Sequence, residues 1–134
     1  MDDMARETIL DYYRNPRNRG HLENPTVSRE EKNPTCGDVI RMDLLIEDEI
    51  VKDVRFSGQG CSISQAAASM LTEMVKGKPL AEVKQISKDD ILDALGLTLG
   101  PARIKCALLG LKALKVGAYG LEGWRDGQPE EEVW

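Results

Sequence analysis

Residues 38–76, DVIRMDLLIEDEIVKDVRFSGQGCSISQAAASMLTEMVK, decide the fold class of this chain. Apolar and polar residues alternate over 38–47 and again over 49–57, as they do in β-strands that bury one face. The acidic link between these two segments predicts a short hairpin. Over residues 64–76 the apolar residues change to helical spacing, with Ser64 as a candidate N-terminal cap. The stretch therefore predicts a hairpin followed by a helix.

The remaining helices are predicted from the same spacing of apolar residues. They cover residues 4–14, residues 88–95 after the cap Ser87, and residues 101 to about 116 after the first-turn proline Pro101. Residues 21–35 are polar, contain two prolines and predict an irregular crossing. Because the strands precede most of the helices, the order predicts an α+β fold with helices packed against an antiparallel sheet.

The length and charge of the chain limit the number of domains and the classes of protein to which it can belong. A chain of 134 residues with 41% hydrophobic content supports one domain, which we place at residues 1–119, followed by a polar, flexible tail at 120–134. The net charge of −5 and the pI near 5.0 argue against nucleic acid as a partner. No apolar run reaches membrane-spanning length, the N-terminus is not signal-like, and the cysteine count is odd. We therefore expect a cytoplasmic protein whose thiols are available for chemistry.

Three cysteines and one aspartate carry that chemistry. They are Cys36, Asp38, Cys61 and Cys106. Three thiolates and one carboxylate suit Zn²⁺ or an iron–sulfur centre. Residues two apart on a strand share a face, so Cys36 and Asp38 can point at one ion. Cys61 follows a glycine pair where a strand turns towards a helix, and free N–H groups at such a junction stabilise a thiolate. Alternatively, each cysteine is a small buried hydrophobe and Asp38 belongs to a surface turn.

Cys106 lies in the second turn of the last predicted helix. It stands about 200° around the helix axis from Ile104, a residue of the apolar stripe, which indicates that Cys106 is not ordinary core filling. Arg103 and Lys105 precede it, and nearby cations favour the thiolate form. Arg103 either holds an anionic group or is an ordinary solvated arginine. His21 is the only histidine and is expected on a surface loop.

Four motifs give the chain a resemblance to a known family. They are Tyr12-Tyr13-Arg14-Asn15-Pro16-Arg17-Asn18, Asn33-Pro34-Thr35-Cys36-Gly37-Asp38, Gly58-Gln59-Gly60-Cys61-Ser62-Ile63-Ser64 and Pro101-Ala102-Arg103-Ile104-Lys105-Cys106. Their order over about residues 5–116 resembles the U-type scaffolds of iron–sulfur cluster assembly, namely IscU, SufU and the N-terminal part of NifU. The resemblance implies a three-stranded antiparallel sheet packed against helices, with a metal site at one end.

The resemblance also implies a function. The positions that match the family's ligands are Cys36, Asp38, Cys61 and Cys106. Family members accept persulfide sulfur from a cysteine desulfurase of the SufS or IscS kind and serve recipient apo iron–sulfur proteins. IscU-like members build a [2Fe–2S] cluster, whereas SufU-like members hold Zn²⁺ and act as zinc-dependent sulfur acceptors. Cys106, with Arg103 beside it, is our candidate for the persulfide acceptor.

Details near Cys106 favour the SufU type. IscU has a histidine directly before the last cysteine, where this chain has Lys105, as in SufU. Leu99-Gly100-Pro101-Ala102-Arg103 replaces the IscU stretch that binds an Hsp70-type chaperone, so we expect no such chaperone partner. The segment between Cys61 and Cys106 is nevertheless short, as in IscU, whereas SufU proteins usually carry an insertion there.

Two other functions fit the cysteines. One is a structural zinc domain that serves only as a protein-interaction module. The other is a thiol oxidoreductase, which the absence of a C-x-x-C pair disfavours.

Overall fold

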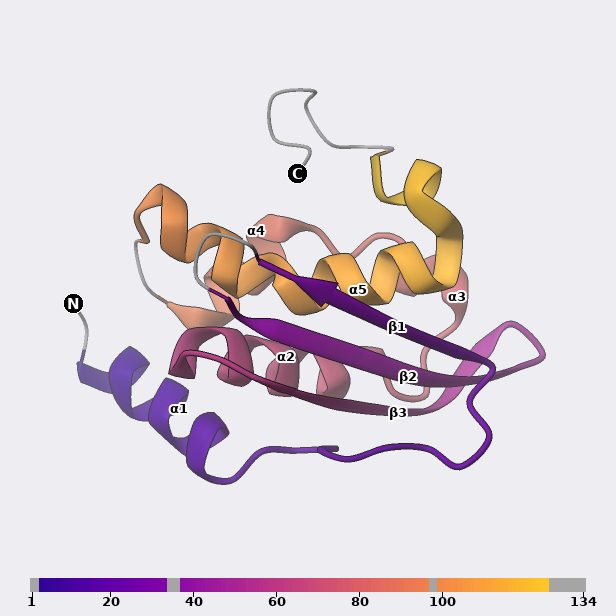
Figure 1. Ribbon diagram of the computed structural model, residues 1–134, viewed down its shortest axis with the longest axis horizontal. Coiled ribbons are helices and arrows are strands. Elements are labelled where there is room, and N and C mark those ends of the chain that lie inside the picture. Colours follow the sequence, from indigo (N-terminus) through magenta and orange to yellow (C-terminus); the bar gives the residue numbers. More distant parts are fainter. Residues whose placement is uncertain (1–2, 34–36, 97–98, 126–134) are drawn as a thin grey trace.

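The computed structural model describes residues 3–33, 37–96 and 99–125. Its elements are α1 (Asp3–Arg14), β1 (Val27–Lys32), β2 (Val39–Glu47), β3 (Ile50–Gln59), α2 (Ser62–Val75), α3 (Leu80–Val83), α4 (Lys88–Leu95) and α5 (Pro101–Arg125). The predicted α+β class is confirmed, with one antiparallel sheet and helices packed on it (Figure 1). Within the described ranges, no helix is both long and apolar enough to cross a membrane.

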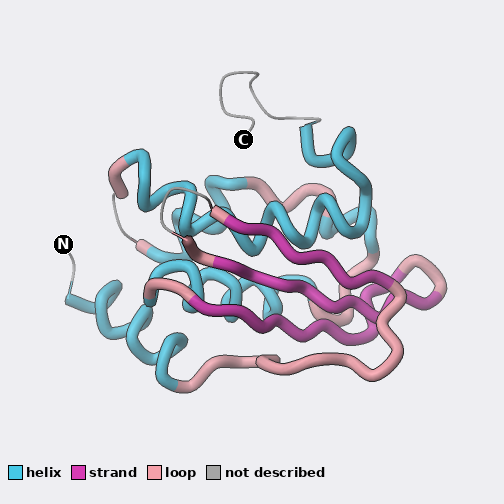
Figure 2. The backbone as a smooth tube through the Cα atoms, in the orientation of Figure 1, coloured by secondary structure: helices cyan, strands magenta, loops and turns pink. Residues whose placement is uncertain are grey.

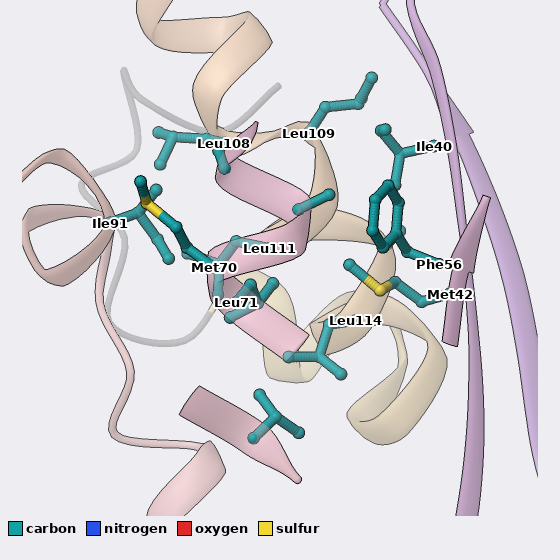
Figure 3. Close-up of a cluster of buried hydrophobic side chains, with 14 of the residues drawn as sticks. Ile40, Met42, Phe56, Met70, Leu71, Ile91, Leu108, Leu109, Leu111 and Leu114 are labelled. Carbon is teal, nitrogen blue, oxygen red and sulfur yellow. The ribbon is translucent and has the colours of Figure 1, made fainter. Parts of the chain in front are cut away.

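The three strands form a sheet in the order β1-β2-β3, and each neighbouring pair is antiparallel. Asp48 and Glu49 join β2 to β3 as a two-residue turn with positive φ angles of 53° and 62°, the backbone that tight hairpins favour. The helices α2 and α5 lie along one face of the sheet (Figure 1). On that face Ile40, Met42 and Phe56 are buried and face the leucines of α2 and α5 (Figure 3).

β1 is the strand that the residue pattern misses, since residues 21–35 were expected to be irregular. Its sequence VSREEK carries four charges in six residues, so it shows no apolar alternation. On the inner side of β1, Glu31 pairs with Lys112 of α5 at 3.5 Å. Val27 packs so closely on α5 that a Cβ atom at Gly117 would lie 2.8 Å from its Cγ1. The strand is therefore covered through an ion pair and a close backbone approach rather than through large apolar side chains.

α5 is longer than predicted. The predicted helix ends at about residue 116, just before Gly117, whereas α5 continues to Arg125. Gly117 packs against β1 instead of ending the helix, and the Tyr119 hydroxyl beyond it donates a hydrogen bond to the Leu80 carbonyl. These contacts explain why the helix continues. Residues 126–134, most of the predicted tail, lie outside the described part of the chain.

The segment between α1 and β1 runs along the outer edge of β3 before it reaches β1 (Figure 2). The Gly20 N–H donates to the Phe56 carbonyl at 2.8 Å, and the Phe56 N–H donates to the Asn18 carbonyl at 2.9 Å. The segment therefore pairs with β3 in a short parallel bridge.

The motif at residues 12–18 ties this segment to α2. The Arg17 guanidinium lies 4.0 Å over the Tyr12 ring, and the Arg17 backbone N–H donates to Ser69 Oγ at 2.7 Å. The Tyr12 hydroxyl donates to Glu73, also on α2. The motif thus fixes α2, the helix that begins directly after Cys61.

Asp43 is a buried carboxylate on the face of the sheet opposite to α2 and α5. It accepts hydrogen bonds from Ser28 Oγ at 2.7 Å, Arg41 Nε at 2.9 Å and the Leu22 N–H at 3.1 Å. Burial raises the pKa of Asp43, but these hydrogen bonds outweigh burial and leave the pKa below its ordinary value. His21 is exposed, as predicted, with Nδ1 3.7 Å from Asp43 Oδ2. Asp43 therefore anchors the loop before β1 to the sheet.

Candidate metal centre

Asp38 lies directly before β2, next to the point where β3 leads into α2, and its side chain is buried. Gly60 lies between β3 and α2 with a φ of +153°. A Cβ atom at Gly60 would lie 2.4 Å from Asp38 Cγ, so a side chain there would enter the space of the carboxylate. Glycine at this position therefore allows Asp38 to approach the start of α2.

Cys61 is the N-cap residue of α2. Its Sγ lies 3.3 Å from Asp38 Oδ2, and its backbone N–H donates to the same oxygen at 3.4 Å. The carboxylate thus lies at the N-terminal end of a 14-residue helix, where the helix dipole favours negative charge. The prediction that Ser64 caps this helix is wrong. Ser64 lies inside the first turn and donates to the Cys61 carbonyl at 3.0 Å.

Cys106 is only 3% exposed in α5. The apolar stripe predicted around Ile104 is too narrow, because residues 106–111 are all buried whereas Ile104 is only partly buried. Cys106 is buried with them, and its Sγ accepts a hydrogen bond from Asn33 Nδ2 at 3.7 Å. Arg103 and Lys105 are both exposed. The role given to Arg103 stays a prediction.

Asp38, Cys61 and Cys106 converge on one point. A carboxylate oxygen and the two Sγ atoms all lie within 4.8 Å of one another. Tetrahedral zinc with Zn–S bonds of about 2.3 Å holds its ligand atoms roughly 3.8 Å apart, so small side-chain rotations would close the set around an ion. Two soft thiols and a hard carboxylate fit Zn²⁺ or iron. Cys36, the fourth predicted donor, lies outside the described residues.

The segments that bring these donors together lie at one end of the sheet (Figure 1). They are the start of β2, the first turn of α2 and the first turns of α5. The donors come from positions far apart in the sequence, so the tertiary fold, not a local motif, places them. The ligand role of each residue stays a prediction.

Asn33 is a site residue that the sequence analysis does not single out. It is 3% exposed, directly follows β1 and contacts the Cys106 sulfur. The sequence signal was its place at the start of the Asn33 to Asp38 motif, but the contact joins residues 73 positions apart. No local pattern predicts such a contact.

Comparison with known proteins decides the family. Residues 4–125 match the family described as NifU-like N terminal domain. This chain belongs to that family. The zinc-dependent sulfurtransferase SufU of Bacillus subtilis (strain 168) is 43% identical over an alignment of 140 positions, which covers 92% of this NifU-like chain and 95% of that protein. The family predicted from the four motifs is therefore confirmed.

Two further similarities connect the NifU-like chain with scaffold proteins. The iron–sulfur cluster assembly scaffold protein IscU of Aquifex aeolicus (strain VF5) is 42% identical over 112 residues, covering 82% of this chain and 71% of that protein. A crystal structure of an iron–sulfur cluster assembly scaffold protein for the SUF system from Fervidobacterium islandicum AW-1 superposes with a TM-score of 0.72. That protein is 29% identical, and the match covers 83% of this chain and 93% of the solved chain.

Proposed function

We propose that this NifU-like protein acts in cytoplasmic iron–sulfur cluster assembly, where it accepts persulfide sulfur from a cysteine desulfurase and binds Zn²⁺ at the site. The observation that carries the proposal is the convergence of Asp38, Cys61 and Cys106 within 4.8 Å. Similarity to a zinc-dependent sulfurtransferase over 92% of the chain supports zinc as the resting ion. A [2Fe–2S] cluster, held by the same donors, would be cargo for recipient apo iron–sulfur proteins.

The residues that would hold zinc are Asp38, Cys61 and Cys106, with Cys36 as the fourth donor. Bound zinc would supply the positive charge that keeps the thiols deprotonated at neutral pH. The fold already holds the carboxylate donor of this set in place. Asp38 is buried, and the N–H of Cys61 at the start of α2 hydrogen-bonds its carboxylate.

Sulfur acceptance requires a site thiolate to attack the terminal sulfur of the partner's cysteine persulfide. A new S–S bond forms as the partner's S–S bond breaks, the terminal sulfur moves with its proton, and the partner leaves as a thiolate. The exchange needs no external oxidant or reductant. We assign the attack to Cys106, with the exposed Arg103 meeting an anionic group of the partner.

The burial of Cys106 limits its access to a partner and therefore bears on its assignment as the sulfur acceptor. Cys106 is 3% exposed, so residues packed against its sulfur must move before a partner persulfide can reach it. Cys61, partly buried at the N-cap of α2, is the alternative acceptor that needs less movement.

The test is sulfur transfer in an anaerobic mixture of this protein, a cysteine desulfurase and cysteine. We expect the protein to raise alanine release by the desulfurase and to gain one sulfur atom on the peptide that contains Cys106. Cys106→Ser should lose both effects. Lys52→Gln, an exposed residue of β3 at the opposite end of the sheet, should behave as wild type.

The outcomes separate the alternatives. Unchanged alanine release with wild-type protein would reject sulfur acceptance and favour a structural zinc module. Extra sulfur on Cys61 or Cys36 would keep the function and move the acceptor. Metal analysis of protein purified without oxygen identifies the resting occupant, because zinc without sulfide supports the SufU type and equal amounts of iron and sulfide support a cluster scaffold.

A further inference from the structure

Asn33 joins the described residues on either side of Cys36. Its backbone N–H donates to the Asp38 carbonyl at 2.8 Å, and its carbonyl accepts from the Gly37 N–H at 2.7 Å. Its side chain is buried and donates from Nδ2 to Cys106 Sγ at 3.7 Å, a normal length for a hydrogen bond to sulfur. Asn33 therefore contacts both the backbone carbonyl of Asp38 and the thiol of Cys106 in α5.

Each of the two described thiols has a hydrogen-bond contact of a different kind. Sγ of Cys61 lies 3.3 Å from a carboxylate oxygen, which only accepts when it is ionised. Sγ of Cys106 lies against an amide N–H, which only donates. An amide donor matches a sulfur that carries negative charge, as a metal-bound thiolate does.

We propose that Asn33 is a positioning residue that hydrogen-bonds the sulfur of Cys106 in the metal-bound site. The N–H···S bond holds Cys106 at the point shared with Asp38 and Cys61, and it withdraws electron density from the sulfur. Partners in this outer position orient metal ligands and commonly change metal affinity about 10–100-fold. The inference rests on the proposed metal binding and adds a residue that is not among the four predicted donors.

The experiment compares Asn33→Leu, which keeps the side-chain volume and removes the donor, with wild-type protein. Zinc affinity is measured by competition with a chromophoric chelator, and cobalt(II) is used as a spectroscopic substitute. We expect Asn33→Leu to bind zinc about 10–100-fold more weakly. We also expect the thiolate-to-cobalt charge-transfer band to move to longer wavelength, because a sulfur without the hydrogen bond donates electrons more readily. Equal affinity and an unmoved band would overturn the proposal.

A matched control uses Ser64, whose hydroxyl lies close to the other described thiol. Ser64 Oγ lies 3.9 Å from Cys61 Sγ but donates to the Cys61 carbonyl at 3.0 Å. Ser64→Ala should therefore leave the cobalt band in place. A shift as large as that of Asn33→Leu would assign the effect to a general disturbance of the site and overturn the proposal.

A measurement on wild-type protein covers the case in which Asn33→Leu does not fold. In protein loaded with NMR-active cadmium, the side-chain amide proton of Asn33 should show scalar coupling to the metal through the Cys106 sulfur. Absence of that coupling would overturn the role of Asn33. Failure of the wild type to bind zinc, cobalt or cadmium would instead count against the proposed function itself.

Discussion

Asp38 and Asp43 lie close together in sequence, just before and within β2, and both are buried, with exposed fractions of 4% and 1%. Around Asp43 the fold supplies the Arg41 cation and other donors. Asp38 accepts the Cys61 N–H and lies beside two thiols that become anionic when they lose their protons. Burial alone therefore does not mark a ligand. The charge that the neighbouring groups carry distinguishes a structural carboxylate from a candidate metal donor.

Asp38→Asn should give the largest effect on zinc binding, because it removes one of the proposed ligands. Loss of one anionic ligand should weaken zinc binding by more than about 100-fold, since changes to outer partners alone cost about 10–100-fold. The metal-free protein should melt near the wild-type temperature, because the amide oxygen of Asn can still accept the hydrogen bond from the Cys61 N–H. Chelator competition and thermal melting measure the two effects. Zinc affinity equal to that of wild type would contradict the ligand assignment.

Gly60→Ala should give the next largest effect, because it displaces Asp38 without removing it. A matched control is Gly20→Ala, since the φ angles of Gly60 and Gly20 are both positive, 153° and 139°. Backbone strain of about 1–3 kcal/mol is expected in both variants. A Cβ atom would meet the Asp38 carboxylate only at Gly60, whereas at Gly20 it meets nothing within 4 Å.

Zinc titration separates the two glycine variants. Both should melt at a lower temperature than wild type, but only Gly60→Ala should also bind zinc about 10-fold or more weakly. If both variants bind zinc equally well, the position of Asp38 does not depend on the absence of a side chain at residue 60.

Asp43→Asn should show the reverse of the behaviour of Asp38→Asn. The amide cannot accept all the hydrogen bonds that the carboxylate accepts, so the free energy of unfolding should fall by about 1–3 kcal/mol. Zinc affinity should not change, because Asp43 lies on the other face of the sheet. Urea unfolding and chelator competition measure both. A large loss of zinc affinity would contradict the separation of the two carboxylates.

The smallest expected effect is the pH dependence of the stability that Asp43 contributes. The pKa of Asp43 is lowered in the folded protein, so its stabilising effect is complete above the range in which unfolded carboxyls titrate and is lost as the pH falls through the lowered pKa. The difference in unfolding free energy between wild type and Asp43→Asn should be constant from about pH 7 to pH 5 and shrink below about pH 4. Urea titrations across this range test the prediction, and a difference that persists unchanged in acid would contradict it.

Local patterns were sufficient for most of the fold. The hairpin, the helix after Cys61 and the cap of α4 are confirmed. At that cap, Ser87 Oγ accepts from the Asp90 N–H at 3.2 Å. Each of these features depends on residues within a few positions. β1 was missed because its partners β2 and α5 come later in the chain. The end of α5 was predicted too early, because a glycine such as Gly117 can either end a helix or admit a neighbouring strand, and only its contact with Val27 distinguishes the two.

The candidate site was predictable as a set of donors but not as an arrangement. Donor chemistry and the family resemblance named Asp38, Cys61 and Cys106, which the structure brings within 4.8 Å. The contact between Asn33 and Cys106 and the wide buried surface of α5 depend on packing between remote segments. Residue spacing along one helix contains no information about such packing.

The parallel bridge on β3 has a consequence for self-association. An open strand edge offers unpaired N–H and carbonyl groups that a second molecule can extend into a larger sheet. Both backbone groups of Phe56 are already used by Asn18 and Gly20, so an incoming strand cannot continue along the middle of that edge. The middle of the β3 edge is thereby closed to a strand from a second molecule.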